Sequence, residues 1–328
     1  MRYSLTLLLA FATWASAFST YAMERALSPW QDWQTTLALE SPLVGQIWSV
    51  RDTRLVSPGF LAEKAADARF VLIGETHDNA DHHRLQAWLI GNIAQQRKPA
   101  VVMEMITADQ APKLAQYLDQ ADATAAGLGA AIDWGKSGWP DWSTYQPIAE
   151  AAIEANLALV AGSATRSRAS DISRGGLKIL ETSERQRLAL DQDLSPELDQ
   201  ALLEDIRQSH CGLLPNEALP AMTQVQRYRD AVLGDALIKA GAVNNGAVLI
   251  AGNGHARADR GVPWYLARLA AGASVVTVML LEADEDAVLP ADYLVVAPDG
   301  TPVADFFWFT PRAAREDPCE MMRRQFGQ

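Results

Sequence analysis

The sequence predicts an α/β fold: a mixed, mainly parallel sheet with flanking helices and an inserted helical subdomain. Six short aliphatic runs rich in Val and Ile alternate with longer stretches of helical periodicity. Such runs are typical of strands buried on both faces of a sheet. Residues 181–240 carry few strand signals and are broken near Gly212 and Pro215. We interpret them as a helical subdomain inserted into one α/β domain that spans residues 24–328.

The predicted elements follow one another in a regular alternation. The six strands are FVLIG (70–74), AVVMEM (100–105), LALVAG (157–162), AVLIAGN (247–253), SVVTVMLL (274–281) and DYLVVAP (292–298). A helix after the first strand is indicated by Leu85, Leu89 and Ile93 at helical spacing, with acidic residues at its start. Helices are also predicted for 110–122, 144–155 and 264–271, and a small hairpin for 45–65.

The first residues have the composition of a secretory signal peptide. Arg2 provides a short positive region, residues 5–14 are apolar, and Ala-Ser-Ala at 15–17 is a small-residue cleavage site. A second such site ends at Ala22. No cysteine for a lipid anchor lies near either site, and no later segment has the roughly 18 apolar residues of a membrane helix. We therefore predict a signal peptide over residues 1–17 and an exported, soluble, periplasmic protein without a lipobox.

The charge balance argues against nucleic acid as a partner. The formal net charge is −12, and no run of Lys and Arg compensates for it. Phosphate backbones are therefore poor partners for this chain.

Cys211 and Cys319 are the only two cysteines. In an exported chain we expect them to form one disulfide, which would fasten the C-terminal region to the middle of the chain. Metal ligation by His210 and Cys211 is the alternative, but adjacent residues seldom share one metal ion.

Acidic and imidazole side chains follow three of the predicted strands. Glu75 and His77 come directly after the first strand, Glu104 ends the second, and His255 follows the fourth. Because ligands of open α/β sheets bind at the carboxyl ends of the strands, we expect these four residues to meet in one crevice.

The histidines of the following helix differ in their predicted environments. At 100° per residue, His82 falls on the face turned toward the sheet, near the same crevice. His83 lies a quarter-turn away and is predicted to be solvated. Any single Glu at a strand end could be a cap or an ion-pair partner, and any single His could be structural.

Carboxylates combined with imidazoles suit two kinds of chemistry. They can bind a divalent transition metal, or they can act as a general acid and base. The spacing does not choose between these alternatives. The chain has no Gly-x-Ser-x-Gly elbow and no P-loop, which disfavours serine hydrolases and nucleotide chemistry.

A cluster of aromatic residues lies at 134–145, between the predicted helix 110–122 and the start of the next predicted helix. It consists of Trp134, Trp139, Trp142 and Tyr145, with polar, Gly and Pro residues in between. Either the cluster is a ligand-binding surface, or it is a hydrophobic plug that closes one βα unit.

Several long motifs together resemble the ChaN-like haem-binding uptake family of the Tiki superfamily, which also contains erythromycin-esterase-like proteins. The motifs are LIGETHDNADHHRLQAWL, VVMEM followed by DQ, WPDWSTYQP, SHCGLLP, QRYRDA and GNGHARADRGVPWYL. The similarity as a whole runs in order from about Gly45 to Cys319. The resemblance implies an α/β fold with a helical subdomain, export to the cell envelope, and haem binding in iron acquisition.

The resemblance also implies more detailed properties. In some members haem pairs are held at a dimer interface with tyrosine as the iron ligand, so a homodimer and a membrane haem transporter are possible partners. Other branches of the superfamily are hydrolases or metalloproteases that use Gly-Glu-x-His and Gly-x-x-His positions, here 74–77 and 252–255. Family members are often lipoproteins, and this chain departs from them in lacking a lipobox cysteine.

We therefore predict a haem-binding protein of haem or iron uptake. The residues predicted to bind haem are Tyr145, Tyr228, Trp139, Trp142, His82 and Arg227. Tyr145 is preferred as the iron ligand and Tyr228 is second, with Arg227 available for a propionate. The polar crevice is predicted to be a separate feature. The alternative function is a metal-dependent hydrolase or protease, with catalytic or metal-ligating roles for Glu75, His77, Glu104 and His255.

Overall fold

The computed structural model describes residues 28–294, 296–298 and 300–325. The predicted signal peptide and both of its cleavage sites lie outside the described residues. None of the described helices is long and apolar enough to cross a membrane.

An eight-stranded sheet forms the centre of the fold, in the order β2-β1-β8-β7-β3-β6-β4-β5. The strands are β1 (Ile47–Ser49), β2 (Arg54–Val56), β3 (Phe70–Glu75), β4 (Ala100–Thr107), β5 (Leu159–Ser163), β6 (Ala247–Gly252), β7 (Val275–Glu282) and β8 (Phe306–Thr310). The ladders from β5 across to β8 are parallel, and β1 pairs antiparallel with both β2 and β8. The predicted mixed, mainly parallel sheet is confirmed, as is the small hairpin at its edge.

Twelve α-helices occur in the described part of the chain. They are α1 (Pro58–Asp67), α2 (Ala80–Gln96), α3 (Ala111–Leu118), α4 (Ala125–Ala131), α5 (Trp142–Glu154), α6 (Arg166–Gly175), α7 (Thr182–Arg187), α8 (Pro196–Ser209), α9 (Leu219–Val243), α10 (Asn253–Ala256), α11 (Val262–Leu269) and α12 (Pro318–Gln325). Short 3-10 helices are η1 (Pro29–Gln31), η2 (Trp134–Lys136), η3 (Leu177–Ile179) and η4 (Pro290–Tyr293).

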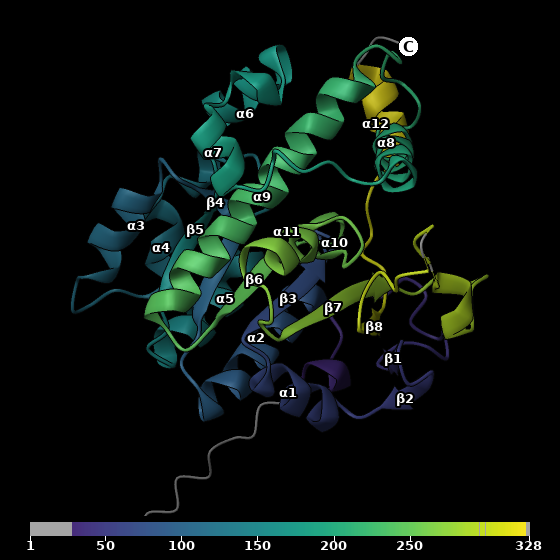
Figure 1. The fold of residues 1–328 in the computed structure, drawn as a ribbon. Coiled ribbons are helices and arrows are strands. Elements are labelled where there is room, and N and C mark those ends of the chain that lie inside the picture. Colours follow the sequence, from purple (N-terminus) through teal and green to yellow (C-terminus); the bar gives the residue numbers. More distant parts are fainter. Residues whose placement is uncertain (1–27, 295, 299, 326–328) are drawn as a thin grey trace, which may run out of the picture.

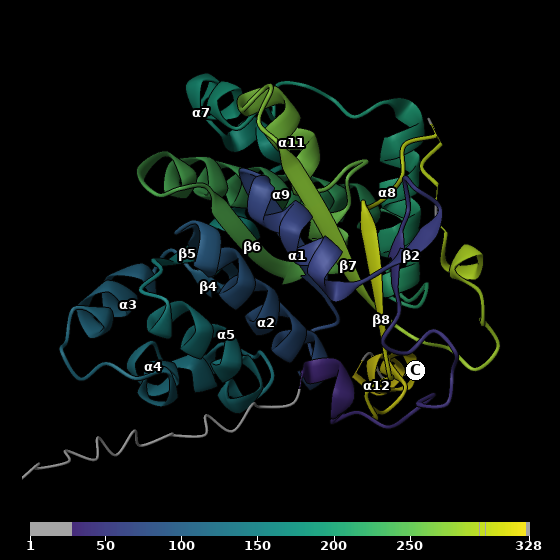
Figure 2. The same ribbon diagram turned by 90° about the horizontal axis from the view of Figure 1, so that it is seen from below.

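Helices cover both faces of the sheet, as Figures 1 and 2 show. Val71 and Ile73 of β3 belong to the core that includes α1, α2 and α5. Phe70 and Leu72 of the same strand belong to the opposite core, formed with α9 and α11. Because successive side chains of a strand point to opposite faces, a continuous aliphatic run is what a strand between two helical layers requires.

The prediction of a sixth strand at 292–298 is wrong. The segment holds η4 and a single bridge between Val296 and Pro302, while the final strand of the sheet is β8. The aromatic run of β8 pairs on one side with β7 and on the other with β1. Its strand conformation is therefore decided by pairing with a distant part of the chain, which a local apolar pattern does not reveal.

Residues 181–240 contain α7, α8 and most of α9, and no strand. Their apolar side chains, among them Leu198 and Leu202, form a cluster with residues of α6 and α11 such as Ile172.

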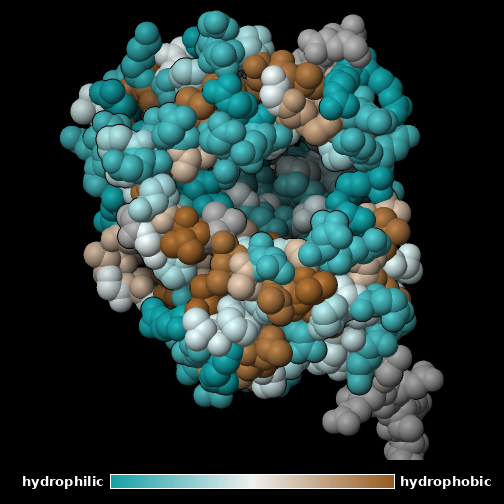
Figure 3. Space-filling model, turned by 90° about the vertical axis from the view of Figure 1, so that its right-hand side faces the viewer, coloured by the Kyte–Doolittle hydropathy of each residue, from teal (hydrophilic) through white to brown (hydrophobic). Residues whose placement is uncertain are grey.

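Helix α8 and the segment after β6 line a cavity of about 380 Å³. Figure 3 shows that this side of the molecule is hollowed, with mostly hydrophilic residues around the hollow.

A disulfide joins Cys211 and Cys319, as predicted. Its Cα–Cα distance of 5.5 Å lies within the usual range for such bonds. The bond links the segment between α8 and α9 to the first turn of α12.

Candidate functional site

The crevice lies at the carboxyl ends of three adjacent strands, β3, β6 and β4. Glu75 ends β3, Glu104 lies near the end of β4, and His255 belongs to the short helix that follows β6. Together with His77 they line one cavity of about 440 Å³, which we call the crevice. The structure thus brings the four residues together as the strand-end argument expects, while their chemical roles stay predictions.

The carboxylate of Glu75 gathers polar groups from three elements. The Tyr145 hydroxyl donates to Glu75 Oε1 at 2.9 Å, and His77 Nδ1 lies 2.9 Å from the same oxygen. His83 Nε2 lies 3.4 Å from Glu75 Oε2, but without the geometry of a hydrogen bond. Glu75 Oε2 and both ring nitrogens of His83 are therefore buried polar atoms without a hydrogen-bond partner.

These contacts change the acidity of each group. Burial opposes a charge on Glu75, but His83 and His77 outweigh it and hold the pKa of Glu75 well below its usual value. Burial would also lower the pKa of His77, yet the bond to Glu75 raises it. Burial and the charge of Glu75 together raise the pKa of Tyr145, so its hydroxyl stays protonated.

Glu104 is the centre of a second buried network. Its Oε2 accepts from the backbone N–H of Gly252 at 2.8 Å, and its Oε1 accepts from the Arg229 guanidinium. His255 Nε2 lies 3.2 Å from Glu104 Oε1, and His255 Nδ1 lies 2.6 Å from Asp230 Oδ1. The imidazole of His255 is thus held between two carboxylates.

The charges in this network stabilise one another. Burial opposes ionisation of Glu104, but His255 and Arg229 lower its pKa to about 2. Burial would likewise lower the pKa of His255, but Glu104 and Asp230 raise it to about 9. At neutral pH His255 is therefore an imidazolium held against the ionised Glu104.

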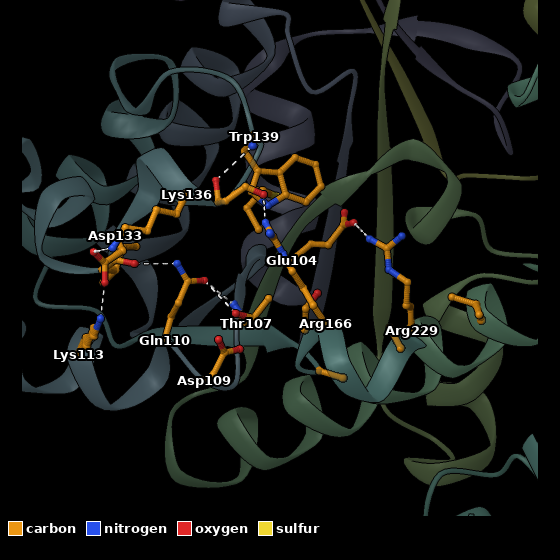
Figure 4. A pocket seen from close by; sticks show the side chains of 17 residues that line it. Glu104, Thr107, Asp109, Gln110, Lys113, Asp133, Lys136, Trp139, Arg166 and Arg229 are labelled. Atoms are coloured by element: carbon orange, nitrogen blue, oxygen red, sulfur yellow. Dashed lines mark hydrogen bonds and ion pairs between the residues drawn. The ribbon is translucent and has the colours of Figure 1, made fainter. Parts of the chain in front are cut away.

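A larger cavity of about 580 Å³ adjoins the crevice, and we call it the side cavity (Figure 4). The crevice and the side cavity share Glu104, Trp139 and Arg229 as lining residues. Trp139 also contacts His77, with ring centroids 4.7 Å apart. A volume of this size is within the range of small-molecule and cofactor sites.

The aromatic cluster divides into two parts. Trp134, Trp142 and Tyr145 are buried in the main hydrophobic core, as the plug interpretation predicts. Trp139 is only partly buried and lines both cavities.

Tyr145 does not lie apart from the crevice. Its ring packs against His83 at 4.0 Å, and its hydroxyl bonds to Glu75. The prediction that the tyrosine site and the polar crevice are separate features is therefore wrong, because α5 packs directly against α2 and points this side chain at the end of β3.

Like Tyr145 and Trp142, three further predicted haem-binding residues line neither the crevice nor the side cavity. Tyr228 is buried in the cluster of the helical subdomain, and Arg227 contacts Asp193 and the Gln192 carbonyl. His82 is fully buried: its Nδ1 accepts from the Thr76 N–H at 2.8 Å and its Nε2 lies 2.9 Å from the Thr310 hydroxyl. Burial lowers the pKa of His82 to about 4, as suits a neutral, structural ring.

The prediction of a solvated His83 is wrong, since its side chain is completely buried beside Glu75. The contribution of Asp230 was not predicted either. The signal for it was present, because Asp230 belongs to the QRYRDA stretch that carries the family resemblance. Its contact with His255 depends on how α9 crosses the sheet, which the sequence does not reveal.

No ready-made metal site is present in the part of the chain that the structure describes. Among these residues, no group of three or more His, Cys, Asp and Glu side chains is placed to hold a metal ion. Glu104 is already bonded to a backbone N–H, to Arg229 and to His255, so a cation at this carboxylate would displace positive groups.

The family is shown by a sequence comparison. The model of the family described as "Haem-binding uptake, Tiki superfamily, ChaN" matches residues 61–266, which is more than half of the chain. This chain belongs to that family. The match spans the strands β3 to β6 and therefore contains every residue of the crevice. The resemblance carried by the sequence motifs is thus confirmed.

Solved structures support the fold of this ChaN family member. A structure described as cofacial haem binding to ChaN of Campylobacter jejuni has a TM-score of 0.63 and 19% identity, covering 80% of this chain and 95% of that chain. The type III effector HopBA1 scores 0.43 at 12% identity, covering 76% and 91%. An erythromycin esterase mutant scores 0.38 at 16% identity, covering 90% and 87%. The two lower scores carry no argument. Comparison with curated proteins finds no match.

Proposed function

We propose that this protein binds haem at the crevice and the side cavity, and that it serves haem or iron uptake in the periplasm. Membership of the haem-binding ChaN family is the observation that carries the proposal. The disulfide supports an oxidising compartment, as does the predicted signal peptide. A membrane haem transporter and a second copy of the chain are the partners we propose.

The residues present fit a haem group in several respects. The two cavities offer enough volume, and Trp139 offers a partly exposed aromatic surface between them. Haem would bring an iron that accepts a donor atom from the protein, and two propionates that carry negative charge. The chain must therefore provide a donor atom for iron and cations for the propionates.

His77 is the donor that the crevice presents most directly. Its side chain is 35% exposed, and its Nδ1 is oriented by Glu75. Such a carboxylate partner fixes the orientation of a ligating imidazole and raises its basicity. Nε2 of His77 is then the atom that we propose as the ligand of the haem iron.

Tyr145 stays a proposed ligand under a stricter condition. Its hydroxyl is fully buried and bonded to Glu75, so ligation requires that it exchange this bond for iron and lose its proton. Both burial and the neighbouring carboxylate oppose that deprotonation. We therefore place His77 before Tyr145, and the predicted Tyr228, which is remote from the crevice, after both.

Titration with hemin tests the proposal. The wild type is expected to bind hemin with a shifted Soret band, and His77→Ala is expected to lose that spectrum. Glu75→Gln removes the charge that orients His77 and should weaken binding by roughly 10–100-fold. Tyr117→Phe, which removes a hydroxyl bonded to Thr124 away from the crevice, is the control and should bind as the wild type does.

Two other results of the hemin titration would contradict this assignment of the iron ligand or the proposal itself. If Tyr145→Phe changes the spectrum and His77→Ala does not, then tyrosine is the iron ligand and the crevice rearranges on binding. If the wild type leaves the hemin spectrum unchanged, the haem proposal fails.

A second candidate function is a metal-dependent hydrolase or protease that uses Glu75, Glu104 and His255. One observation favours it: the contact of Glu104 with His255 places a carboxylate and an imidazole at the wall of the crevice. This candidate predicts that a divalent metal survives dialysis, as elemental analysis would show. It also predicts turnover of an ester or peptide panel that disappears in Glu75→Gln.

A further inference from the structure

Arg166 differs from the other cations that line the side cavity. Lys113 and Lys136 both pair with Asp133, and Arg229 pairs with Glu104. Arg166 makes no ion pair with any of the residues that the structure describes. Its guanidinium donates instead to the backbone carbonyl of Ser137. Figure 4 shows Arg166 among the side chains that line the cavity.

The carbonyl that Arg166 holds belongs to the segment of residues 133–141, which we call the Trp139 loop. The loop turns at Gly138, whose φ of +82° lies in the left-handed region. It presents Trp139 at the boundary between the side cavity and the crevice, in contact with His77. One arginine from α6 therefore ties down the loop that places the aromatic wall of the site.

A carbonyl is a weak partner for an arginine compared with a carboxylate. An Arg–carboxylate pair is charge-assisted and can form two parallel hydrogen bonds, whereas the carbonyl of Ser137 is neutral. The pair Arg166–Ser137 is thus replaceable by a ligand that carries a carboxylate into the side cavity.

The charges around the side cavity favour Arg166 as the anchor. The whole chain has a formal charge of −12, so an anionic ligand is repelled on average by the rest of the protein and depends on the cations of the site. The cations that line the side cavity face the carboxylates of Glu104, Asp109 and Asp133. Lys113 and Lys136 share Asp133, and Arg229 pairs with Glu104, whereas Arg166 pairs with no carboxylate of the described residues.

We infer that Arg166 anchors a carboxylate of a flat amphipathic ligand in the side cavity, while Trp139 covers an apolar face of the same ligand. The inference rests on the proposed function, since haem carries two propionates, and it names the residue that recognises one of them. It replaces Arg227, which lines neither cavity and contacts residues 192 and 193. When Arg166 exchanges the Ser137 carbonyl for the ligand carboxylate, it also releases the Trp139 loop. Binding of the ligand therefore changes the position of the Trp139 indole.

The test compares two ligands on two variants. The ligands are hemin and hemin dimethyl ester, in which both carboxylates are masked. The variants are Arg166→Gln and, as a matched control, Arg174→Gln, which removes the same charge from the same helix at a residue that lines neither cavity. Thermal unfolding monitors whether each variant folds, which is expected because both side chains are exposed.

Arg166→Gln should weaken hemin binding by roughly 10- to 100-fold, as for loss of a hydrogen bond to a charged group. The ester should bind the wild type about as weakly, and Arg166→Gln should not weaken the ester further. Arg174→Gln should bind both ligands as the wild type does.

The inference is overturned if Arg166→Gln binds hemin as tightly as Arg174→Gln, or if Arg166→Gln weakens the ester as much as the acid. In either case the proposed function survives, because hemin still binds the wild type. A wild type that binds neither ligand overturns the proposed function and this inference together.

Discussion

Replacing Cys211 and Cys319 by serine is expected to lower the free energy of unfolding by roughly 4–5 kcal/mol. The two residues are 108 positions apart, so the disulfide closes a long loop. In the chain-entropy account, a long closed loop restricts the unfolded chain strongly, and its loss stabilises the unfolded state. The first turn of α12 is largely exposed, so few other contacts replace the bond.

Denaturant unfolding of the oxidised wild type and the double variant measures this difference. Wild type treated with a thiol reductant should unfold at the midpoint of the double variant. Equal midpoints for the oxidised wild type and the double variant would show that the bond contributes nothing. Non-reducing mass spectrometry provides the control, since it counts free thiols directly.

Raising the pH from about 6.5 to above 9 should destabilise the protein by roughly 3 kcal/mol. The folded state raises the pKa of His255 to about 9, because Glu104 and Asp230 flank its ring. A raised pKa means that the stabilisation is complete below the unfolded value of about 6.5 and is lost as the pH rises through 9. His77, whose pKa is also raised, adds a loss of the same sign.

Stability measured by denaturant unfolding at several pH values checks this expectation. Glu104→Gln removes one of the two charges that hold the proton on His255, so the alkaline loss should shrink while the protein is less stable at neutral pH. His210→Gln replaces a histidine that lines neither the crevice nor the side cavity and should keep the full loss. A wild-type profile that is flat between pH 6.5 and 9 would mean that His255 is neutral in the folded protein.

The convergence of Glu75, Glu104 and His255 is predictable from the sequence because parallel strands end at one edge of a sheet, whichever strand is the neighbour. The surroundings of these residues are not predictable in this way. His83 and Tyr145 meet Glu75 because α2 and α5 pack at one particular rotation. Hydropathy marks which side of a helix is apolar, but it does not reveal that a histidine and a tyrosine will share a carboxylate.

The strand order of the sheet has a consequence for how the chain folds. Strands β3 and β4 follow one another in the sequence, yet β6 lies between them and pairs with both. The backbone of Gly252 bonds to Glu104, a residue 148 positions earlier in the chain. The chain is synthesised from its N-terminus, so β3 and β4 are made before β6. Until β6 is present, β3 and β4 share no hydrogen bonds, and the strand edges that will pair with β6 stay unpaired. A fragment that stops before Ala247 should remain susceptible to proteolysis across β3 and β4, and assembly of the protein waits on this distant, slow pairing step.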